Sequence, residues 1–600
     1  MKYIRRTKTD IKTNFLKNLL IDRGIIPEND KEYQQMFFYP TEKNLLNPLD
    51  LDNMEDGFNL FLKHLKAESN FYFVVDSDAD GFTSSAIFIN YMENNLRKMY
   101  PNFSINYHIP DGKEHGLDTI MDILTKEKIY DIIVLPDSSS NDYEYHKILK
   151  DMGYDLLILD HHEAEKYSED AIVINNQLSK KYGNKSLSGV GVVYKFLQYC
   201  DKQFNLNNAA NEFLDLVAVG ECGDMMNLNT LENRYICNYG FNHLKNFGLK
   251  KLVQQQSYSI FGTTIDKEKD IEEYLNKVKL TPIQVAFYIV PLINALIRVG
   301  TQKEKEILFK SFINGNETIL STKRCHRGEV ETIAEQNARN CINARSRQNR
   351  EKDKALDLLT IQISNDCLDD NKILILNADE LDVSNTLTGL CAMGVSAKYK
   401  KPVLLGRIND GYLKGSMRGR SESELKDFKE FLVKSGYMDY VEGHANAAGF
   451  SIKISNISKL YDYANKELKN INFNEGFYEA DFIVNGNCSY LNDIILDLEH
   501  GKDFYGQNCA EPVIIVENIT IDTSSIQIIG TNKDTLKFVF NDITYIKFKA
   551  KDLINKLTKY SGKISITVAG KGNVNTWGGK ENSQIFIEEI EINEVDKYGF

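Results

Sequence analysis

The sequence has no long uninterrupted hydrophobic run and no zinc-type cysteine pattern. No stretch of its 600 residues approaches the roughly 18 consecutive apolar residues of a membrane-spanning helix, and residues 1–8 lack the apolar core of a signal peptide. The nine cysteines include no Cys-x-x-Cys pair and no cysteine and histidine cluster with zinc spacing. We therefore expect a soluble, cytoplasmic protein without membrane association, whose cysteines are small core residues in a reducing compartment.

The chain also lacks an excess of positive charge. Its 72 lysine and arginine residues stand against 85 aspartate and glutamate residues, which gives a formal net charge of −13. Such a protein is a poor overall match to nucleic acid, but local charge decides phosphate contacts. Residues 339–354 contain six basic and two acidic side chains on what reads as a helix. This segment is either a surface that follows a phosphate backbone or a solvated connecting helix.

Length and pattern predict several domains, without internal repeats or low-complexity tracts. At about 150 residues per domain, 600 residues suggest three or four units. Residues 71–225 alternate apolar strands with helix-like segments, the pattern of a parallel sheet with crossover helices. A mostly helical region, a long polar helix, a smaller α/β region and a region of short alternating strands follow, at about 207–320, 328–359, 372–470 and beyond 475.

Charged residues follow two of the apolar strands in the α/β region. Three alternating aspartates follow residues 71–75, and an aspartate and two histidines follow residues 156–159: Asp76, Asp78, Asp80, Asp160, His161 and His162. Unpaired carboxylates cost several kcal/mol to remove from water, so charge at a buried strand end requires compensation. A divalent cation is the simplest compensation, and alternate residues of an extended segment would face it together. Taken singly, Asp80 or Asp224 could instead cap a helix.

Four short motifs, taken in order, resemble those of the DHH phosphoesterase family. They are Asp76-Ser77-Asp78-Ala79-Asp80-Gly81, Asp137 after the strand at 132–135, Asp160-His161-His162, and Asp224 in a helical stretch. The stretch 187–196 is similar to the Leu-x-Gly-x-Gly-Val-x-x-Lys motif of the RecJ branch. Residues 415–418 and 443–450 resemble the Gly-Ser-x-Arg and Gly-His-x-x-Ala-Ala-Gly motifs of the DHHA1 domain. The resemblance covers about residues 45 to 550.

This resemblance implies an α/β architecture with a parallel-sheet DHH domain, a long connecting helix, a smaller α/β DHHA1 domain and a C-terminal OB-like β-barrel. The expected boundaries are an N-terminal extension at 1–45, the DHH domain at 46–320, the connecting helix at 321–360, the DHHA1 domain at 361–474 and the OB-like domain at 475–600. In that last domain, aromatic and basic residues suit base stacking and phosphate contact, or form an ordinary barrel surface: Lys537, Phe538, Tyr545, Lys547, Phe548 and Lys549.

The resemblance also implies the roles of the site residues. The metal ligands would be Asp76, Asp78, Asp80, Asp137, His161 and Asp224, with Asp137 as the bridge between two ions. A carboxylate and imidazole set suits manganese, with magnesium as the alternative. Asp160 would orient His161, and His162 would contact phosphate or protonate the leaving group. Substrate binding would fall to Ser416, Arg418, His444, Asn294 and Arg298.

Three segments depart from the family pattern. Residues 109–117 resemble a Pro-x-Arg-x-x-Glu-Gly-Tyr-Gly stretch but lack its arginine and tyrosine; Lys113 is a candidate substitute, and His108 and His115 receive no functional role. Ser139 stands where the family usually has the glycine of Asp-x-Gly, and Ile297 stands where Gly-Arg is usual. The departures at 139 and 297 remove no ligand; they either reshape the pocket or are typical of a divergent, phage-type member.

The leading hypothesis is a two-metal exonuclease that degrades single-stranded DNA from the 5′ end, in DNA repair or recombination. The alternative is a DHH/DHHA1 phosphodiesterase acting on short oligoribonucleotides, cyclic dinucleotides or a nucleoside bisphosphate; residues 475–600 favour the exonuclease. A catalytically silent binding protein is a third hypothesis, which the retained ligands disfavour. Expected partners are single-stranded DNA and a single-strand-binding protein or RecQ-type helicase, and the protein is expected to be a monomer.

Overall fold

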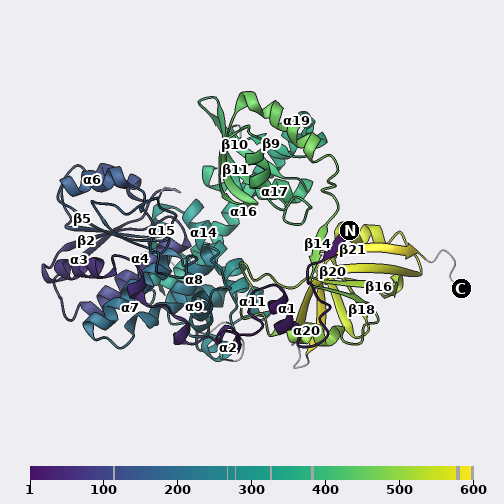
Figure 1. The fold of residues 1–600 in the computed structure, drawn as a ribbon, viewed down its shortest axis with the longest axis horizontal. Helices are drawn as coiled ribbons and strands as arrows, with labels where there is room; N and C mark the ends of the chain where they lie inside the picture. Colours follow the sequence, from purple (N-terminus) through teal and green to yellow (C-terminus); the bar gives the residue numbers. More distant parts are fainter. Residues whose placement is uncertain are drawn as a thin grey trace. The chain divides into compact units, whose positions relative to one another are not determined.

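The computed structural model describes the whole chain except residues 113–114, 266–267, 277–278, 325–327, 380, 382–383, 576–580 and 596–600. Its contacts divide the chain into two compact units. One contains residues 29–348 and 503–510; the other contains residues 1–28, 349–502 and 511–600. Figure 1 shows the helices and strands of both units.

A five-stranded sheet forms the centre of the first unit. Its order is β3-β2-β4-β5-β6, and every neighbouring pair is parallel. The strands are β2 (Asn70–Val74), β3 (Ser104–His108), β4 (Ile132–Pro136), β5 (Asp155–Asp160) and β6 (Ile172–Asn175). Strand β3 is a half-buried edge strand whose mixed polar residues give no apolar run, so the sequence pattern does not predict it. The chain leaves β2 toward β3 on one side and returns to β4 on the other, which creates a topological switch point between β2 and β4.

Both faces of this sheet are covered, which explains the continuous apolar runs of its strands. Alternate strand residues, such as Phe73 and Val134, share a core with α3 (Met54–Lys66), α4 (Ala79–Tyr91) and α7 (Gly189–Phe204). The residues between them pack toward α5 (Met121–Leu124) and α6 (Tyr143–Asp151). Figure 1 shows α6 on one side of the strands and α3 and α7 on the other.

The rest of the first unit is mostly helical, as the sequence pattern predicts. Its helices are α2 (Lys31–Phe38), α8 (Leu214–Gly223), α9 (Leu231–Asn242), α10 (Phe247–Gln255), α11 (Ser257–Phe261), α12 (Glu268–Leu275), α13 (Pro282–Gln284), α14 (Val290–Val299) and α15 (Gln302–Asn314). The stretch Pro282–Val299 is long and apolar enough to cross a membrane, but half of it is buried and core helices pass the same test. Helix α16 (Ile333–Asn365) begins in this unit and ends in the other.

The second unit contains two mostly antiparallel sheets, a smaller one of five strands and a larger one of seven. The smaller sheet has the order β12-β13-β11-β10-β9, with β9 (Leu374–Asn377), β10 (Val403–Asn409), β11 (Tyr412–Arg418), β12 (Met438–His444) and β13 (Ala447–Lys453). Its helices are α17 (Thr388–Tyr399), α18 (Phe428–Lys434) and α19 (Ile457–Glu467). These elements lie within residues 361–474, for which a DHHA1 domain stays a prediction.

The larger sheet contains seven strands in the order β15-β16-β20-β21-β19-β18-β17. They are β15 (Phe482–Asn485), β16 (Ile514–Asp522), β17 (Gln527–Ile529), β18 (Thr535–Phe540), β19 (Ile543–Lys547), β20 (Lys563–Asn575) and β21 (Asn582–Val595), with α20 (Leu491–Glu499) and α21 (Lys551–Leu557). Among the described residues, no pairing of β15 with β17 closes the expected barrel.

The N-terminal residues add to this unit through a contact that spans most of the chain. Strand β1 (Lys2–Arg5) pairs in parallel with β14 (Phe477–Ala480), and α1 (Phe15–Asp22) contacts α20. Just beyond, Arg23 forms a buried ion pair with Asp481 at 2.7 Å. Part of the expected N-terminal extension therefore completes the C-terminal domain.

Candidate metal centre

The three aspartates that follow β2 reach the switch point from different local structures. Asp76 lies in the loop after the strand, Asp78 caps α4 by accepting a hydrogen bond from the Gly81 amide at 3.0 Å, and Asp80 lies in the first helical turn. The expectation that all three share one face of an extended segment is therefore wrong, because β2 ends at Val74 and α4 begins at Ala79. The turn into the helix brings them together.

Asp80 is held by the amino end of helix α7. The Gly189 and Val190 amides donate to its two carboxylate oxygens at 2.7 and 3.1 Å. Free amides at a helix amino end favour negative charge. A side chain at Gly189 would overlap the Asp137 carboxylate, and one at Gly220 would overlap Asp80. The glycines of these two helices let the backbone approach the carboxylates closely.

Asp137 follows β4 directly and has an unusual backbone conformation. Its φ is +69°, its amide donates to the Leu159 carbonyl at 2.7 Å, and its side chain is almost fully buried. Ser139, two residues on, has a φ of +77°. Positive φ favours glycine, which explains why the family usually has glycine at this second position.

His161 faces the carboxylates from the end of the neighbouring strand. Its Nε2 lies 3.0 Å from Asp224 Oδ2, 3.2 Å from Asp137 Oδ1 and 4.0 Å from Asp80 Oδ2. Asp224 is the residue that follows α8 and caps its carboxyl end. The structure thus brings all six predicted metal ligands to one edge of the sheet.

Their ligand atoms form two overlapping groups. Within each group the atoms lie within 4.8 Å of one another: Asp80, Asp137, His161 and Asp224 in one, and Asp76, Asp78 and Asp137 in the other. Asp137 belongs to both. A third group joins Asp137, His161 and His162.

The electrostatics of these carboxylates fit a divalent cation. Burial, then repulsion from Asp224 and other carboxylates, raises the pKa of Asp78 to about 7. Burial and Asp224 likewise raise the pKa of Asp80 to about 6, against the opposing effect of His161. Asp137 Oδ1 and His161 Nε2 are buried and have no partner with hydrogen-bond geometry. A cation would satisfy both atoms and favour the ionised carboxylates.

Asp160 contacts His162 rather than the ring of His161. Its Oδ1 accepts from His162 Nδ1 at 2.8 Å, and its Oδ2 accepts from the Ser140 amide at 3.0 Å. Burial alone would raise the pKa of Asp160, but His162 and Ser140 hold it below its usual range. Asp160 Oδ1 also accepts from the His161 backbone amide at 2.7 Å. The carboxylate thus holds the backbone of His161 and the ring of the half-exposed His162, and its role in orienting His161 stays a prediction.

Two predicted substrate residues lie beside the Asp78 loop on α14. Asn294 Oδ1 accepts a hydrogen bond from the Ala79 amide at 3.1 Å, so this side chain supports the start of α4. Burial lowers the pKa of the Arg298 guanidinium, and the nearby negative charge of Asp78 opposes that shift. Arg298 is partly exposed, which leaves it a candidate for phosphate contact.

The DHHA1-type residues lie in the other unit and form rows across its smaller sheet. Arg418 pairs with Ala447, which pairs in turn with His444. Ser416, two residues before Arg418, pairs with Gly449. Paired residues of antiparallel strands point to one face, so Ser416, Arg418 and His444 flank a floor of small residues.

Three of the six aromatic and basic residues considered for strand binding in the C-terminal sheet have structural roles. Phe538 and Tyr545 are buried, and their rings stack with centroids 4.9 Å apart. The Lys547 amine donates to the Ile587 and Glu588 carbonyls. That part of the prediction is wrong, because alternation did not identify which face is buried. Phe548, 60% exposed, and Lys549 remain accessible.

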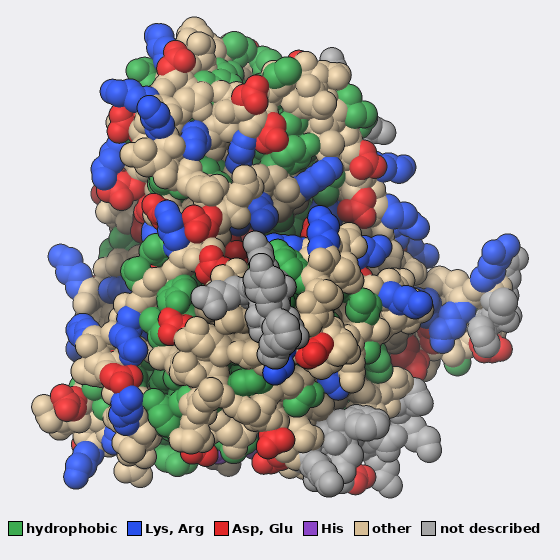
Figure 2. Space-filling model, turned by 90° about the vertical axis from the view of Figure 1, so that its right-hand side faces the viewer, with side chains coloured by type: hydrophobic (Ala, Val, Ile, Leu, Met, Phe, Trp, Pro, Cys, Tyr) green, Lys and Arg blue, Asp and Glu red, His purple; other side chains and the backbone are tan. Residues whose placement is uncertain are grey.

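The basic segment of α16 is partly neutralised. Arg339 contacts Glu331 at 2.6 Å and Arg347 contacts Glu304 at 2.8 Å, whereas Arg350 is exposed. On the face in Figure 2, lysine and arginine side chains are interspersed with aspartate and glutamate. Part of the charge of this segment is thus paired, and whether it also follows a phosphate backbone stays a prediction.

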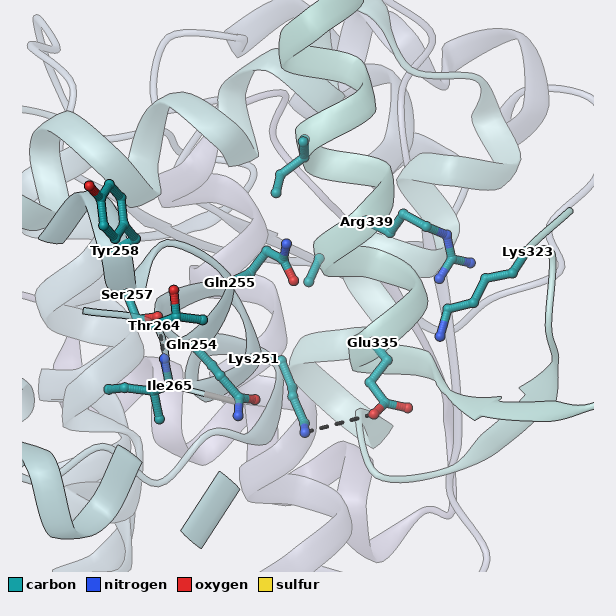
Figure 3. Close-up of a pocket in the computed structure, with 12 residues that line it drawn as sticks. Lys251, Gln254, Gln255, Ser257, Tyr258, Thr264, Ile265, Lys323, Glu335 and Arg339 are labelled. Atoms are coloured by element: carbon teal, nitrogen blue, oxygen red, sulfur yellow. Dashed lines mark hydrogen bonds and ion pairs between the residues drawn. The ribbon is translucent and has the colours of Figure 1, made fainter. Parts of the chain in front are cut away.

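A separate cavity of about 440 Å³ lies among α10, α11 and the start of α16 (Figure 3). Its cations have acidic neighbours: Lys251 lies 3.8 Å from Glu335, and Lys323 lies 3.5 Å from Glu331. None of the predicted metal ligands lines it. We assign no catalytic role to it.

Sequence reasoning missed one residue at the metal edge. His115 Nδ1 lies 3.0 and 2.9 Å from the two carboxylate oxygens of Asp76. The contact joins residues 39 positions apart through a loop, and no local pattern signals it. Lys113, the candidate substitute for the missing arginine, lies outside the described residues.

Comparison with known proteins defines the class. Residues 70–220 match the N-terminal domain of the DHH family, and residues 491–589 match the RecJ OB domain. Over 605 residues, 99% of this chain and 98% of the relative, the chain is 36% identical to the putative SPbeta prophage-derived single-strand DNA-specific exonuclease YorK of Bacillus subtilis. The chain therefore belongs to the DHH family, in the branch that contains RecJ.

More distant relatives match almost the whole length of the chain. The single-stranded-DNA-specific exonuclease RecJ of Bacillus subtilis is 23% identical, over 97% of this chain and 68% of the relative. The crystal structure of RecJ in complex with Mn²⁺ from Thermus thermophilus matches with a TM-score of 0.67 and 18% identity, over 99% of this chain and 80% of that chain. This structural likeness supports the shared fold.

Proposed function

We propose that the protein is a metal-dependent exonuclease that hydrolyses phosphodiester bonds of single-stranded DNA from the 5′ end, in repair or recombination. The observation that carries the proposal is the membership of Asp137 in both ligand groups, the arrangement that a carboxylate bridging two cations requires. The names of the YorK and RecJ relatives support the substrate, and the RecJ structure with Mn²⁺ supports manganese, with magnesium as the alternative.

The residues divide the chemistry among them. Asp80, Asp137, His161 and Asp224 would hold one ion, and Asp76, Asp78 and Asp137 the other. Bound ions of this kind activate water and neutralise phosphate oxygens during in-line displacement. Asp160 fixes the His162 ring through Nδ1, which directs the remaining nitrogen away from it and makes His162 the candidate for phosphate contact or leaving-group protonation. Arg298 would add a positive charge beside Asp78.

Ser416, Arg418 and His444 would bind the substrate phosphate from the DHHA1-type sheet, where no metal ligand is predicted. The exposed Phe548 and Lys549 would contribute to the grip on a longer strand. The second candidate is a phosphodiesterase acting on short oligoribonucleotides, cyclic dinucleotides or a nucleoside bisphosphate, which the names of the relatives favour less than the exonuclease. A single-strand-binding protein or a RecQ-type helicase remains the proposed protein partner, and a monomer remains the proposed state.

End-labelled substrates test this function directly. Long single strands, duplexes and trinucleotides, labelled at one end or the other, would be digested with Mn²⁺. We expect early release of the 5′ label from long single strands, with duplexes resistant. Preferential hydrolysis of the trinucleotide would favour the second candidate, and early release of the 3′ label would contradict the polarity.

A further inference from the structure

His115 contacts a carboxylate of the metal centre without belonging to a ligand group. Its Nδ1 lies about equally far from both oxygens of Asp76, which is buried, whereas the His115 side chain is 55% exposed. An ionised carboxylate only accepts hydrogen bonds, so Nδ1 must be the donor. The contact thereby fixes the two carboxylate oxygens of Asp76. These are the atoms that would bind the ion held together with Asp78 and Asp137.

The loop that carries His115 is tied to the loop after β4. The Leu117 amide donates to Ser139 Oγ at 3.1 Å and to Asp142 Oδ2 at 3.3 Å. Between them, Gly116 has a φ of +64°, and a side chain there would lie 2.7 Å from Ser139 Oγ. The backbone around His115 is thus held by the segment that begins with Asp137.

Ser139 has a conformation that glycine would adopt more easily. Its φ of +77° is unfavourable for a serine, yet its hydroxyl supplies the hydrogen bond to Leu117. Strain is retained where the surrounding structure uses it, and here the hydroxyl joins the two loops together with the Asp142 carboxylate. Both departures from the family pattern, at 109–117 and at 139, therefore meet at one contact.

We propose that His115 is a positioning residue of the metal centre, which holds the Asp76 carboxylate in place and whose loop is held by Ser139 through the Leu117 amide. The inference rests on the proposed metal-dependent function and adds to it a second layer of residues around the ions. Such partners fix the direction of a ligand's lone pairs, and their loss typically lowers metal affinity by roughly 10- to 100-fold.

Titration calorimetry with Mn²⁺ on the full chain tests the proposal, with ion counts from elemental analysis. His115→Ala should weaken the binding of one ion by about tenfold or more. His115→Asn should restore most of the affinity, because Asn Nδ2 and His Nδ1 are both bonded to Cγ and can donate from the same place. His243→Ala is the matched control: this exposed histidine contacts the Tyr239 carbonyl on α9.

A double-mutant cycle tests the role of Ser139. Ser139→Gly relieves the positive φ, so it should keep or raise the thermal midpoint while lowering Mn²⁺ affinity less than His115→Ala does. In the His115→Ala background it should have no further effect, because Ser139 acts through His115. Additive losses would show that Ser139 acts on Asp137 instead.

Two outcomes separate this inference from the function on which it rests. Unchanged Mn²⁺ affinity in His115→Ala, with weakened binding in Asp137→Asn, would overturn the role of His115 and leave the metal centre intact. Absence of Mn²⁺ binding by the wild-type chain would overturn the metal-dependent function itself.

Discussion

The sequence predicts the residues at the metal edge of the parallel sheet well, but it predicts the binding residues of the C-terminal sheet poorly. At the metal edge, all six predicted ligands converge, because buried charge after an apolar strand has few explanations other than a ligand. In the C-terminal sheet, Phe538 and Tyr545 turn out to be core residues, because an alternating pattern serves burial and binding equally well. A site that requires buried charged groups is therefore easier to predict than a binding surface made of aromatic and basic residues, which also occur in ordinary strands.

The largest effect should come from Asp137→Asn, which keeps the shape of the side chain and tolerates the positive φ. Loss of the shared carboxylate should lower the rate of hydrolysis on the order of 1,000-fold and weaken binding of both ions. Rates with saturating Mn²⁺ and calorimetry would measure this. Asp151→Asn, at the exposed carboxyl end of α6, is the control. Retention of most activity in Asp137→Asn would contradict the proposal that Asp137 is shared by two ions.

The C-terminal sheet should separate stability from binding. Phe538→Ala should lower the free energy of unfolding by about 3–5 kcal/mol, since the ring is buried. Phe548→Ala should leave the thermal midpoint near that of the wild type but weaken affinity for a long single strand by about 1–3 kcal/mol if a base stacks there. Unfolding curves and fluorescence anisotropy would distinguish them. Unchanged affinity in Phe548→Ala would leave this sheet without an identified stacking residue.

Features that depend on neighbouring residues in the sequence were predictable, whereas features that depend on contacts between distant segments were not. The strands β2, β4, β5 and β6 carry continuous apolar runs, whereas the edge strand β3 does not and was missed. The ring contact of Asp160 with His162 could not be predicted, because the turn after β5 decides which ring faces the carboxylate. The contacts of β1 with β14 and of His115 with Asp76 join distant segments, and no local periodicity encodes them.

The DHHA1-type residues should behave differently from both regions. Arg418→Ala should lower kcat/KM by about 10- to 100-fold, the value of a hydrogen bond to a charged group, without changing the number of bound Mn²⁺ ions. Arg418→Lys should recover part of this loss if only charge is needed. Loss of an ion in Arg418→Ala, or in His444→Ala, would place the residue among the ligands and contradict its role in substrate binding.

The smallest effect is a pH dependence that belongs to the metal edge alone. Without metal, the raised pKa values of Asp78, about 7, and Asp80, about 6, mean that the folded chain holds protons there that the unfolded chain releases above about pH 4. This contribution to stability is therefore lost as the pH rises from about 4 to about 7. Mn²⁺ must displace the same protons, so its affinity and the stabilisation it gives should increase over that window and level off above it.

Thermal midpoints with and without Mn²⁺ from pH 5 to pH 8 would measure the effect, at constant ionic strength. Asp78→Asn removes one of the titrating groups and should flatten the dependence, whereas Phe548→Ala should leave it unchanged. A stabilisation by Mn²⁺ that does not vary with pH would show that the carboxylates are already ionised in the metal-free protein. The cation would then replace an existing counter-charge rather than protons. The pH dependence would then not distinguish the metal edge from the C-terminal sheet.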